Sequence, residues 1–246
     1  MPLKPITPET ANRFCCLVVA PAGTGKTSLL RTIMGQEFNP DARQWEQKEE
    51  PSQKVCTLSA EAGLLCVRDL VTAGLVQGYE IGSLLDFKEA LSMLMQPDFK
   101  ERYQWVFIDS LTEISSRCVE HMKQKHQGGK DAFKLWGEYN DTMTQIIKAF
   151  RDMTDYNVVF TCLEKIETDE QKIRYVAPAI SGNELKERLT SYFDEVFRMV
   201  EFTTEEGRSI RVFHTDKPIG LAKDRSGCLG SIENPNLLHI QRKILP

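Results

Sequence analysis

Residues 20–27 read Ala-Pro-Ala-Gly-Thr-Gly-Lys-Thr, the pattern of a phosphate-binding loop, and this motif constrains the fold more than any other part of the chain. It follows the apolar run 14–20, which is short enough to be a buried strand, and it precedes residues 28–34, which predict a helix. The Walker A motif requires this order of strand, glycine-rich turn and helix. Position 20 is Ala where the strict pattern has Gly, a small departure that the motif tolerates.

The residue types in this loop suit a nucleotide. Gly23 and Gly25 let the backbone bend so that successive N–H groups point into one concavity, and the helix adds the positive end of its dipole. Lys26 can then reach the β- and γ-phosphates, and the Thr27 hydroxyl can ligate Mg²⁺. The residues predicted to bind nucleotide here are Ala22, Gly23, Thr24, Gly25, Lys26, Thr27 and Ser28. The expected cofactors are ATP and Mg²⁺.

Composition narrows the class of protein. With 246 residues, 41% hydrophobic and 27% charged, the chain suits one α/β domain. A net charge of −4 gives no overall nucleic-acid signature, so any DNA contact must be local. The seven cysteines form no CxxC pair, which argues against a metal cluster and fits a reducing cytoplasm. The four histidines lack metal-ligand spacing and are interpreted as structural. We expect no membrane segment, because no apolar run is long enough.

The order of elements predicts the fold class. Pro2, Pro5 and Pro8 indicate that residues 1–12 form an extended arm, and residues 13–246 are expected to form one domain. Strands are expected at residues 14–20, 54–59, 79–81, 105–109 and 157–162. Helices are expected at residues 28–34, from about 86 onward, at 111–125 and at 136–153. A further helix is expected to begin at a capping box formed by Ser181 and Glu184 and to end at about residue 192. Residues 38–53 are predicted to be an exposed loop, and hairpins are expected at 164–176 and 195–214. This alternation predicts a mainly parallel central sheet with helices on both faces and late antiparallel hairpins.

A second nucleotide motif ends the strand at residues 105–109. Four apolar residues lead to Asp109, the pattern of a Walker B strand, whose carboxylate can hold Mg²⁺ through water. The alternative is a buried strand that ends in a helix cap, but the Walker A motif upstream favours the functional interpretation. Asp109 followed directly by Ser110 resembles the RecA class of P-loop ATPases, whereas AAA+ and helicase proteins more often place a Glu at this position. Ser110 cannot activate water, so a catalytic base must come from elsewhere.

These motifs resemble the RecA-like class of P-loop ATPases and, within it, a phage-type branch, the ATPases of the Sak group of single-strand annealing proteins. The resemblance covers nearly all of the chain after the arm. It rests on residues 20–27, 59–63, 105–110, 182–183 and 223–225.

The resemblance implies roles for three further charged residues. Glu61, in Leu-Ser-Ala-Glu-Ala-Gly, has the position of the catalytic Glu that orients water, although it can also be an acid in a first helical turn. Arg225 and Lys223 are candidates for a finger that reaches a neighbouring subunit's γ-phosphate; a surface turn or a salt bridge to Asp224 is the alternative. Thr161 stands where the class has a phosphate sensor, but the usual Gln is missing.

The resemblance also implies two DNA-binding segments. The first contains Gly128-Gly129 between two helices, and its candidates for contact with single-stranded DNA are Lys123, Lys125, Lys130, Phe133 and Lys134. The second is the hairpin at 164–179, with Lys172 and Arg174. A solvated loop is the alternative for the lysines. Trp136 and Tyr139 are expected in the core because they continue the helical stripe.

The function implied is ATP-dependent DNA recombination or repair. Such a protein binds single-stranded DNA, promotes annealing or strand exchange as a homo-oligomeric ring or filament, and works beside a single-strand DNA-binding protein. It would act in the cytoplasm, the host's if a phage encodes it. Two alternatives remain: a helicase- or packaging-type motor, and a regulatory ATPase whose partner is a protein.

Overall fold

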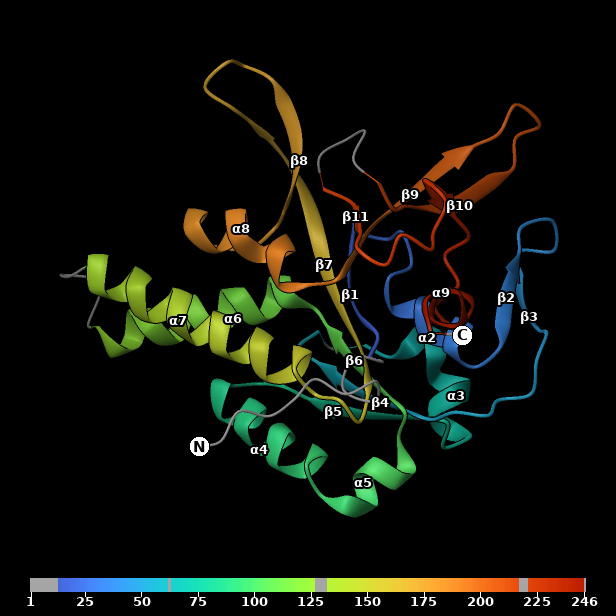
Figure 1. The fold of residues 1–246 in the computed structure, drawn as a ribbon, viewed down its shortest axis with the longest axis horizontal. Coiled ribbons are helices and arrows are strands. Elements are labelled where there is room, and N and C mark those ends of the chain that lie inside the picture. The colour runs from blue at the N-terminus through green and yellow to red at the C-terminus, as the bar shows by residue number, and fades with distance from the viewer. Residues whose placement is uncertain (1–12, 62, 127–131, 217–220, 246) are drawn as a thin grey trace.

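The computed structural model describes residues 13–61, 63–126, 132–216 and 221–245. The predicted arm at residues 1–12 lies outside them. The described residues build one large sheet with helices packed on both of its faces and one separate two-stranded hairpin (Figure 1).

Within the described residues, ten strands form the large sheet, eight of them in the order β12-β10-β9-β1-β7-β6-β4-β5. The strands from β9 to β5 in this order are parallel. On the far side of β1, the strands β10, β11 and β12 add antiparallel pairs. Strand β8 pairs antiparallel with β7. The strands are β1 (Cys15–Ala20), β4 (Val55–Ser59), β5 (Val76–Glu80), β6 (Trp105–Asp109), β7 (Asn157–Thr168), β8 (Arg174–Pro178), β9 (Glu195–Thr203), β10 (Ser209–His214), β11 (Lys223–Asp224) and β12 (Ile232–Glu233).

The helices form a layer on each face of this sheet. In chain order, with η denoting a short 3₁₀-helix, they are η1 (Thr27–Leu29), α2 (Leu30–Ile33), η2 (Leu65–Val67), α3 (Arg68–Thr72), α4 (Leu84–Leu94), α5 (Pro97–Arg102), α6 (Leu111–Lys125), α7 (Ala132–Arg151), α8 (Asn183–Leu189), η3 (Thr190–Tyr192) and α9 (Leu237–Ile244).

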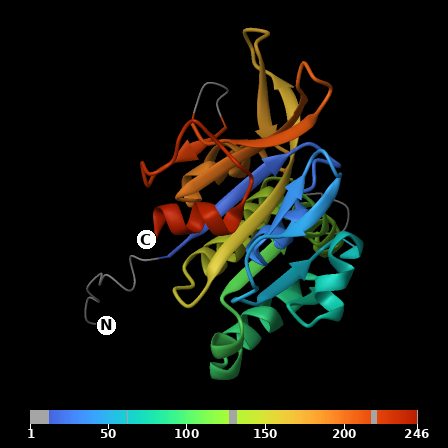
Figure 2. The same ribbon diagram turned by 90° about the vertical axis from the view of Figure 1, so that its right-hand side faces the viewer.

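Strand β1 supplies both hydrophobic cores, because successive strand side chains point to opposite faces. Leu17 and Val19 pack in the core that α4, α6, α7 and α8 cover. Cys16 and Val18 pack in the core covered by α2, α3 and α9. Figure 2, viewed from this second side, shows α9 in front of the strands. The predicted fold class, a mainly parallel α/β sheet with helices on both faces and late antiparallel hairpins, is therefore confirmed.

The prediction of an exposed loop at residues 38–53 is wrong in part. This segment takes part in an antiparallel hairpin, β2 (Gln36–Asn39) and β3 (Gln44–Gln47). Phe38 lies opposite Trp45 in the register, and the two rings pack edge to face with centroids 5.6 Å apart. A cross-strand aromatic pair of this kind stabilises a short hairpin. One apolar residue on each strand is too weak a pattern to reveal a hairpin in the sequence.

The capping box predicted for α8 is also wrong. Gly182 precedes the helix with a φ of 77°, and no side chain caps it. The Ser181 N–H instead donates to the Ser115 hydroxyl, and the Glu184 carboxylate accepts from the Asn140 amide. Contacts with α6 and α7 therefore replace the local cap.

Smaller differences concern lengths and one aromatic residue. Helix α7 begins at Ala132, four residues before the predicted start at Trp136. The short helices α3 and α5 were not predicted, whereas the hairpin predicted at 164–176 is confirmed as the continuation of β7 to Thr168 and its pairing with β8. Tyr139 is buried as expected, but Trp136 is 40% exposed and packs edge to face on the Tyr139 ring.

Candidate nucleotide-binding site

The phosphate-binding loop connects β1 to η1 and α2, so the strand, turn and helix that Walker A requires are present. Gly23 and Gly25 have φ angles of 76° and 98°, in a region that residues with a side chain rarely adopt. The Thr24 hydroxyl donates to the Pro21 carbonyl at 3.0 Å and closes the turn. The loop therefore has the backbone geometry that turns N–H groups toward a phosphate.

Lys26 is folded over this loop. It is 8% exposed, and its ammonium donates to the carbonyls of Ala20 and Pro21 at 3.3 and 2.9 Å. Burial lowers the pKa of Lys26, and the nearby carboxylates of Asp109 and Glu61 act in the opposite direction. Phosphate oxygens are stronger acceptors for a charged amine than backbone carbonyls. Lys26 is therefore placed to exchange these carbonyl contacts for a nucleotide's phosphates.

Asp109 lies beside the loop at the end of β6. The Thr27 hydroxyl donates to its Oδ2 at 2.6 Å, and the Thr161 hydroxyl, from β7, donates to its Oδ1. Burial raises the pKa of Asp109, which is 3% exposed, while the two threonine hydrogen bonds lower it.

A hydroxyl and a carboxylate held 2.6 Å apart are hard oxygen ligands of the kind that Mg²⁺ takes in nucleotide sites. The donor set of Thr27 and Asp109 therefore fits the ion. Thr27 and Asp109 would hold the ion, which would supply positive charge next to the phosphate oxygens of a bound nucleotide. The described residues contain no cluster of three or more His, Cys, Asp or Glu side chains that could hold another metal.

Glu61 follows β4, the neighbour of β6, at the same edge of the sheet. Ser59 lies opposite Asp109 in the register, and the Ser110 hydroxyl donates to the Glu61 carboxylate at 2.5 Å. The Arg117 guanidinium, from α6, donates to the Ala60 carbonyl at 2.8 Å and fixes the backbone before Glu61. Glu61 itself is exposed, so water can reach its carboxylate. The structure thus brings Lys26, Thr27, Asp109 and Glu61 to one edge of the sheet.

An ion pair that no sequence motif revealed lies next to this group. Arg198, from β9, donates to both Glu164 carboxylate oxygens, at 2.8 and 3.1 Å, and both side chains are largely buried. The Glu164 charge also acts on the pKa of Lys26. In the sequence, this ion pair could have been predicted from the charged residue that lies inside each of two apolar strand patterns. Charged residues are rarely buried unless they are paired.

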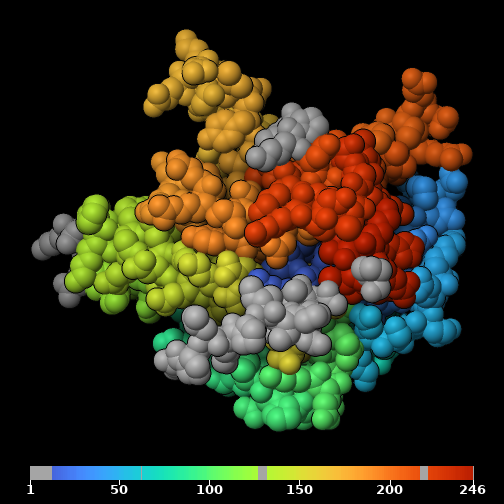
Figure 3. Space-filling view, viewed as in Figure 1, coloured from blue at the N-terminus to red at the C-terminus, as the bar shows by residue number. Residues whose placement is uncertain are grey.

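The residues predicted to bind DNA lie on segments that project away from this site. Lys123, Lys125, Phe133 and Lys134 are exposed near the α6–α7 connection, and the Lys125 ammonium contacts the Glu138 carboxylate at 2.6 Å. Lys130 and Gly128-Gly129 lie outside the described residues. Lys172 and Arg174 are exposed at the end of the β7–β8 hairpin. Figure 3 shows the β7–β8 and β9–β10 hairpins standing out from the body as two separate prongs.

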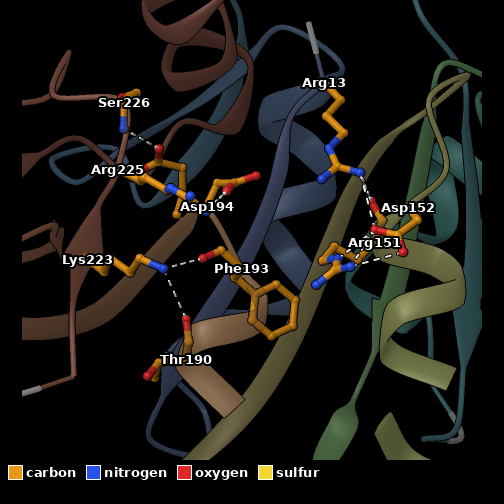
Figure 4. A network of polar contacts seen from close by, with 10 residues as sticks. Arg13, Arg151, Asp152, Thr190, Phe193, Asp194, Lys223, Arg225 and Ser226 are labelled. Carbon is orange, nitrogen blue, oxygen red and sulfur yellow. Dashed lines mark hydrogen bonds and ion pairs between the residues drawn. The ribbon is translucent and has the colours of Figure 1, made fainter. Parts of the chain in front are cut away.

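Lys223 and Arg225, the candidates for the finger, lie away from the phosphate-binding loop. Lys223 pairs with Val196 near the start of β9, whereas the loop follows the end of the parallel neighbour β1. The Lys223 ammonium donates to the carbonyls of Thr190 and Phe193, and the Arg225 guanidinium pairs with Asp194 at 2.9 Å (Figure 4). The salt bridge of Arg225 is thus made to Asp194 and not to the neighbouring Asp224. Neither basic residue lines the nucleotide site of its own chain.

Comparison with known proteins agrees with these motifs. Residues 12–226 match a protein family described as "AAA domain". The chain belongs to this family. This AAA domain protein therefore carries a nucleotide-binding ATPase domain. A search of curated proteins finds no match.

Among solved structures, the AAA domain protein is similar to the flagellar accessory protein FlaH from Methanocaldococcus jannaschii. The TM-score is 0.44 and the sequence identity 8%, over 91% of this chain and 87% of FlaH. Of the helices that the structure describes, none combines the length and apolar character needed to cross a membrane.

Proposed function

We propose that this AAA domain protein hydrolyses ATP and uses it in DNA recombination or repair, binding single-stranded DNA and promoting annealing or strand exchange. The observation that carries the enzymatic part is the convergence of Lys26, Asp109 and Glu61 at the carboxyl edge of the sheet. We also propose that the protein is related to the RecA-like class of P-loop ATPases and, within that class, to the phage-type ATPases of the Sak group.

Each residue of the site has a role in the proposed reaction. Lys26 binds the β- and γ-phosphate oxygens and stabilises the charge that develops there. Thr27 and Asp109 hold Mg²⁺. Glu61 orients a water molecule toward the γ-phosphate and accepts its proton, and the Ser110 hydroxyl holds the Glu61 carboxylate in place. The Glu61 role rests on its position beside Asp109 and on its access to water.

The proposed DNA contacts are electrostatic. Lys123, Lys125, Lys130 and Lys134 cluster around one helix connection in a chain whose net charge is −4, so the attraction for phosphates must be local. Phe133, which is 92% exposed, is available to stack on a base. Lys172 and Arg174 on the β7–β8 hairpin offer a second contact.

The proposed finger requires a second copy of the chain, because it acts on the γ-phosphate bound by a neighbouring subunit. Arg225 and Lys223 lie near the start of β9, and the phosphate-binding loop follows the end of β1, so one chain does not bring them together. A neighbour stacked head to tail would bring them together, and such heterologous contacts generate rings or filaments. A single-strand DNA-binding protein is the proposed additional partner, and the cytoplasm the proposed location.

The test is the rate of ATP hydrolysis measured with and without single-stranded oligonucleotides. We expect stimulation by single strands of unrelated sequence, together with faster annealing of complementary strands. Directional unwinding of a duplex would favour a helicase- or packaging-type motor. Hydrolysis without any DNA binding would favour a regulatory ATPase with a protein partner, and absence of hydrolysis in both conditions would contradict the enzymatic assignment.

A further inference from the structure

A cavity of about 750 Å³ lies between the β2–β3 hairpin, the β9–β10 hairpin and the segment before α9. These two hairpins stand side by side at the right of Figure 1 and are joined by the Arg208–Asp41 ion pair at 3.2 Å. The volume of the cavity is in the range of pockets that hold small molecules. Among the described residues assigned above to catalysis, nucleotide binding or DNA binding, Gly25 of the phosphate-binding loop alone lines it.

The cavity begins at the phosphate-binding loop. Gly25 lines it, and Leu29 and Thr32 continue the lining along η1 and α2. Leu29 and Thr32 are three positions apart and so lie on one face of the helical turns that follow the loop, and the cavity runs along this face. A ligand with its phosphates in the loop therefore has the rest of its structure next to this space.

Arg211, from β10, stands where the loop meets the cavity. A Cβ atom added to Gly25 would lie 3.0 Å from the Arg211 Nη1 atom, so the guanidinium approaches the loop closely. The same guanidinium lies over the Phe38 ring, 5.4 Å from its centroid, and contacts the Glu201 carboxylate at 3.4 Å. A planar cation held over an aromatic ring is a stacking platform, and it can also pair with a phosphate.

The remaining lining matches a nucleoside. Phe38 is 37% exposed and Trp45 packs against it, so an aromatic surface faces the space. Glu37 and Glu201 also line it. Their carboxylates can accept hydrogen bonds from ribose hydroxyls and from the amino group of a base.

From these contacts we infer that the cavity holds the base and ribose of the nucleoside triphosphate, with Phe38 and Arg211 as the surface on which the base packs. The inference rests on the proposed binding of ATP and adds its nucleoside subsite. It also assigns a role to the β2–β3 hairpin.

The test compares ATP with inorganic tripolyphosphate, which has the phosphates but neither base nor ribose. Both affinities are measured by calorimetry with Mg²⁺ for the wild-type protein and for Phe38→Ala. We expect the wild-type protein to bind ATP more tightly than tripolyphosphate. Phe38→Ala should weaken ATP binding about 10-fold, the effect of removing one ring on which a base stacks, and leave tripolyphosphate binding unchanged.

Phe202→Ala is the matched control, because Phe202 is an exposed aromatic residue of β9 that does not line the cavity. It should leave both affinities unchanged. Equal wild-type affinities for ATP and tripolyphosphate, or unchanged ATP binding by folded Phe38→Ala, would overturn the inference while leaving the phosphate site intact. A wild-type protein that binds neither ligand would overturn the nucleotide site and the inference with it.

Discussion

Lys26 and Asp109 are 8% and 3% exposed, whereas Phe133, near the connection between α6 and α7, is 92% exposed. In the nucleotide site Asp109, on β6, is held by side chains from two other elements: Thr27 and Thr161 both donate to its carboxylate. Near the α6–α7 connection, the Lys125 contact with Glu138 stays within the same pair of helices.

The difference concerns how the two regions tolerate change. Removing one group from a buried polar cluster leaves its partners without hydrogen bonds, so each substitution has a large and specific effect. Exposed lysines act mainly through summed charge, so each substitution has a small effect that is screened by salt and independent of DNA sequence. Four predictions test this contrast, beginning with the largest effect.

Lys26→Ala should abolish ATP hydrolysis and weaken ATP binding about 100-fold or more, because it removes the buried cation that meets the phosphates. Calorimetry with a folded variant measures the binding, and a phosphate-release assay measures the turnover. Unchanged ATP affinity would contradict the assignment of the phosphate-binding loop.

Glu61→Gln should separate binding from turnover. We expect ATP and Mg²⁺ to bind with near wild-type affinity while kcat falls about 10²- to 10⁴-fold, because only the group that activates water is changed. Glu120→Gln, at an exposed acid later in α6, is the matched control and should leave kcat unchanged. A wild-type kcat in Glu61→Gln would place the catalytic base elsewhere.

Replacing Lys125, Lys130 and Lys134 with Ala should weaken binding to single-stranded DNA about 10-fold or more at low salt. The log–log salt slope should become shallower by about 0.7 for each phosphate that the variant no longer neutralises. Hydrolysis without DNA should stay near the wild-type rate, and its stimulation by DNA should decrease. Fluorescence anisotropy across a salt series, with two oligonucleotides of unrelated sequence, measures both the affinity and the slope.

The control for this triple variant removes the same charge elsewhere, at Lys88, Lys100 and Lys243. Lys88 and Lys243 are exposed and Lys100 is half-buried. Equal reductions in affinity for the two triple variants would mean that overall charge, and not the α6–α7 connection, determines binding. Equal affinities of the first variant and the wild type would favour the β7–β8 hairpin as the DNA contact.

Asp109→Asn should raise stability while it removes the Mg²⁺ dependence of ATP binding. Burial raises the pKa of Asp109 in the folded protein, so folding free energy is lost as the pH rises from the ordinary Asp pKa through this raised pKa, and the loss is present at neutral pH. A neutral Asn avoids it, and about 1 kcal/mol corresponds to about 2–4 °C in Tm for a chain of this size.

Thermal unfolding at pH 7 and at a pH below the ordinary pKa of an Asp side chain measures this change in Tm. The gain in Tm should shrink at the lower pH, where Asp109 is protonated in both states. The triple lysine variant at the α6–α7 connection should leave Tm within about 1 °C at both pH values, because exposed substitutions cost little. A lower Tm for Asp109→Asn at pH 7 would mean that the threonine hydrogen bonds outweigh the cost of burial.

The sequence predicted the parts of the molecule where one local pattern suffices. The bounds of β6 and α6 agree with the prediction, because a buried apolar run and a clear helical period lie on either side of Asp109 and Ser110. The β2–β3 hairpin was missed because one apolar residue on each strand, Phe38 and Trp45, is too weak a pattern to predict it. Trp136 follows the helical stripe and is still 40% exposed, because the spacing places a residue on a helix face but does not decide how much of its side chain the neighbouring elements cover.

The sequence by itself determined the strand, turn and helix of the phosphate-binding loop, the strand that ends at Asp109 and the alternation of strands and helices. These features depend on residue spacing and on the special backbone conformations of glycine, which are local. The tertiary structure decided which distant residues meet: Thr161 with Asp109, Arg198 with Glu164, and Arg211 with Phe38 beside Gly25. These contacts join segments that are far apart in the chain and adjacent only in the folded protein, so no local pattern encodes them.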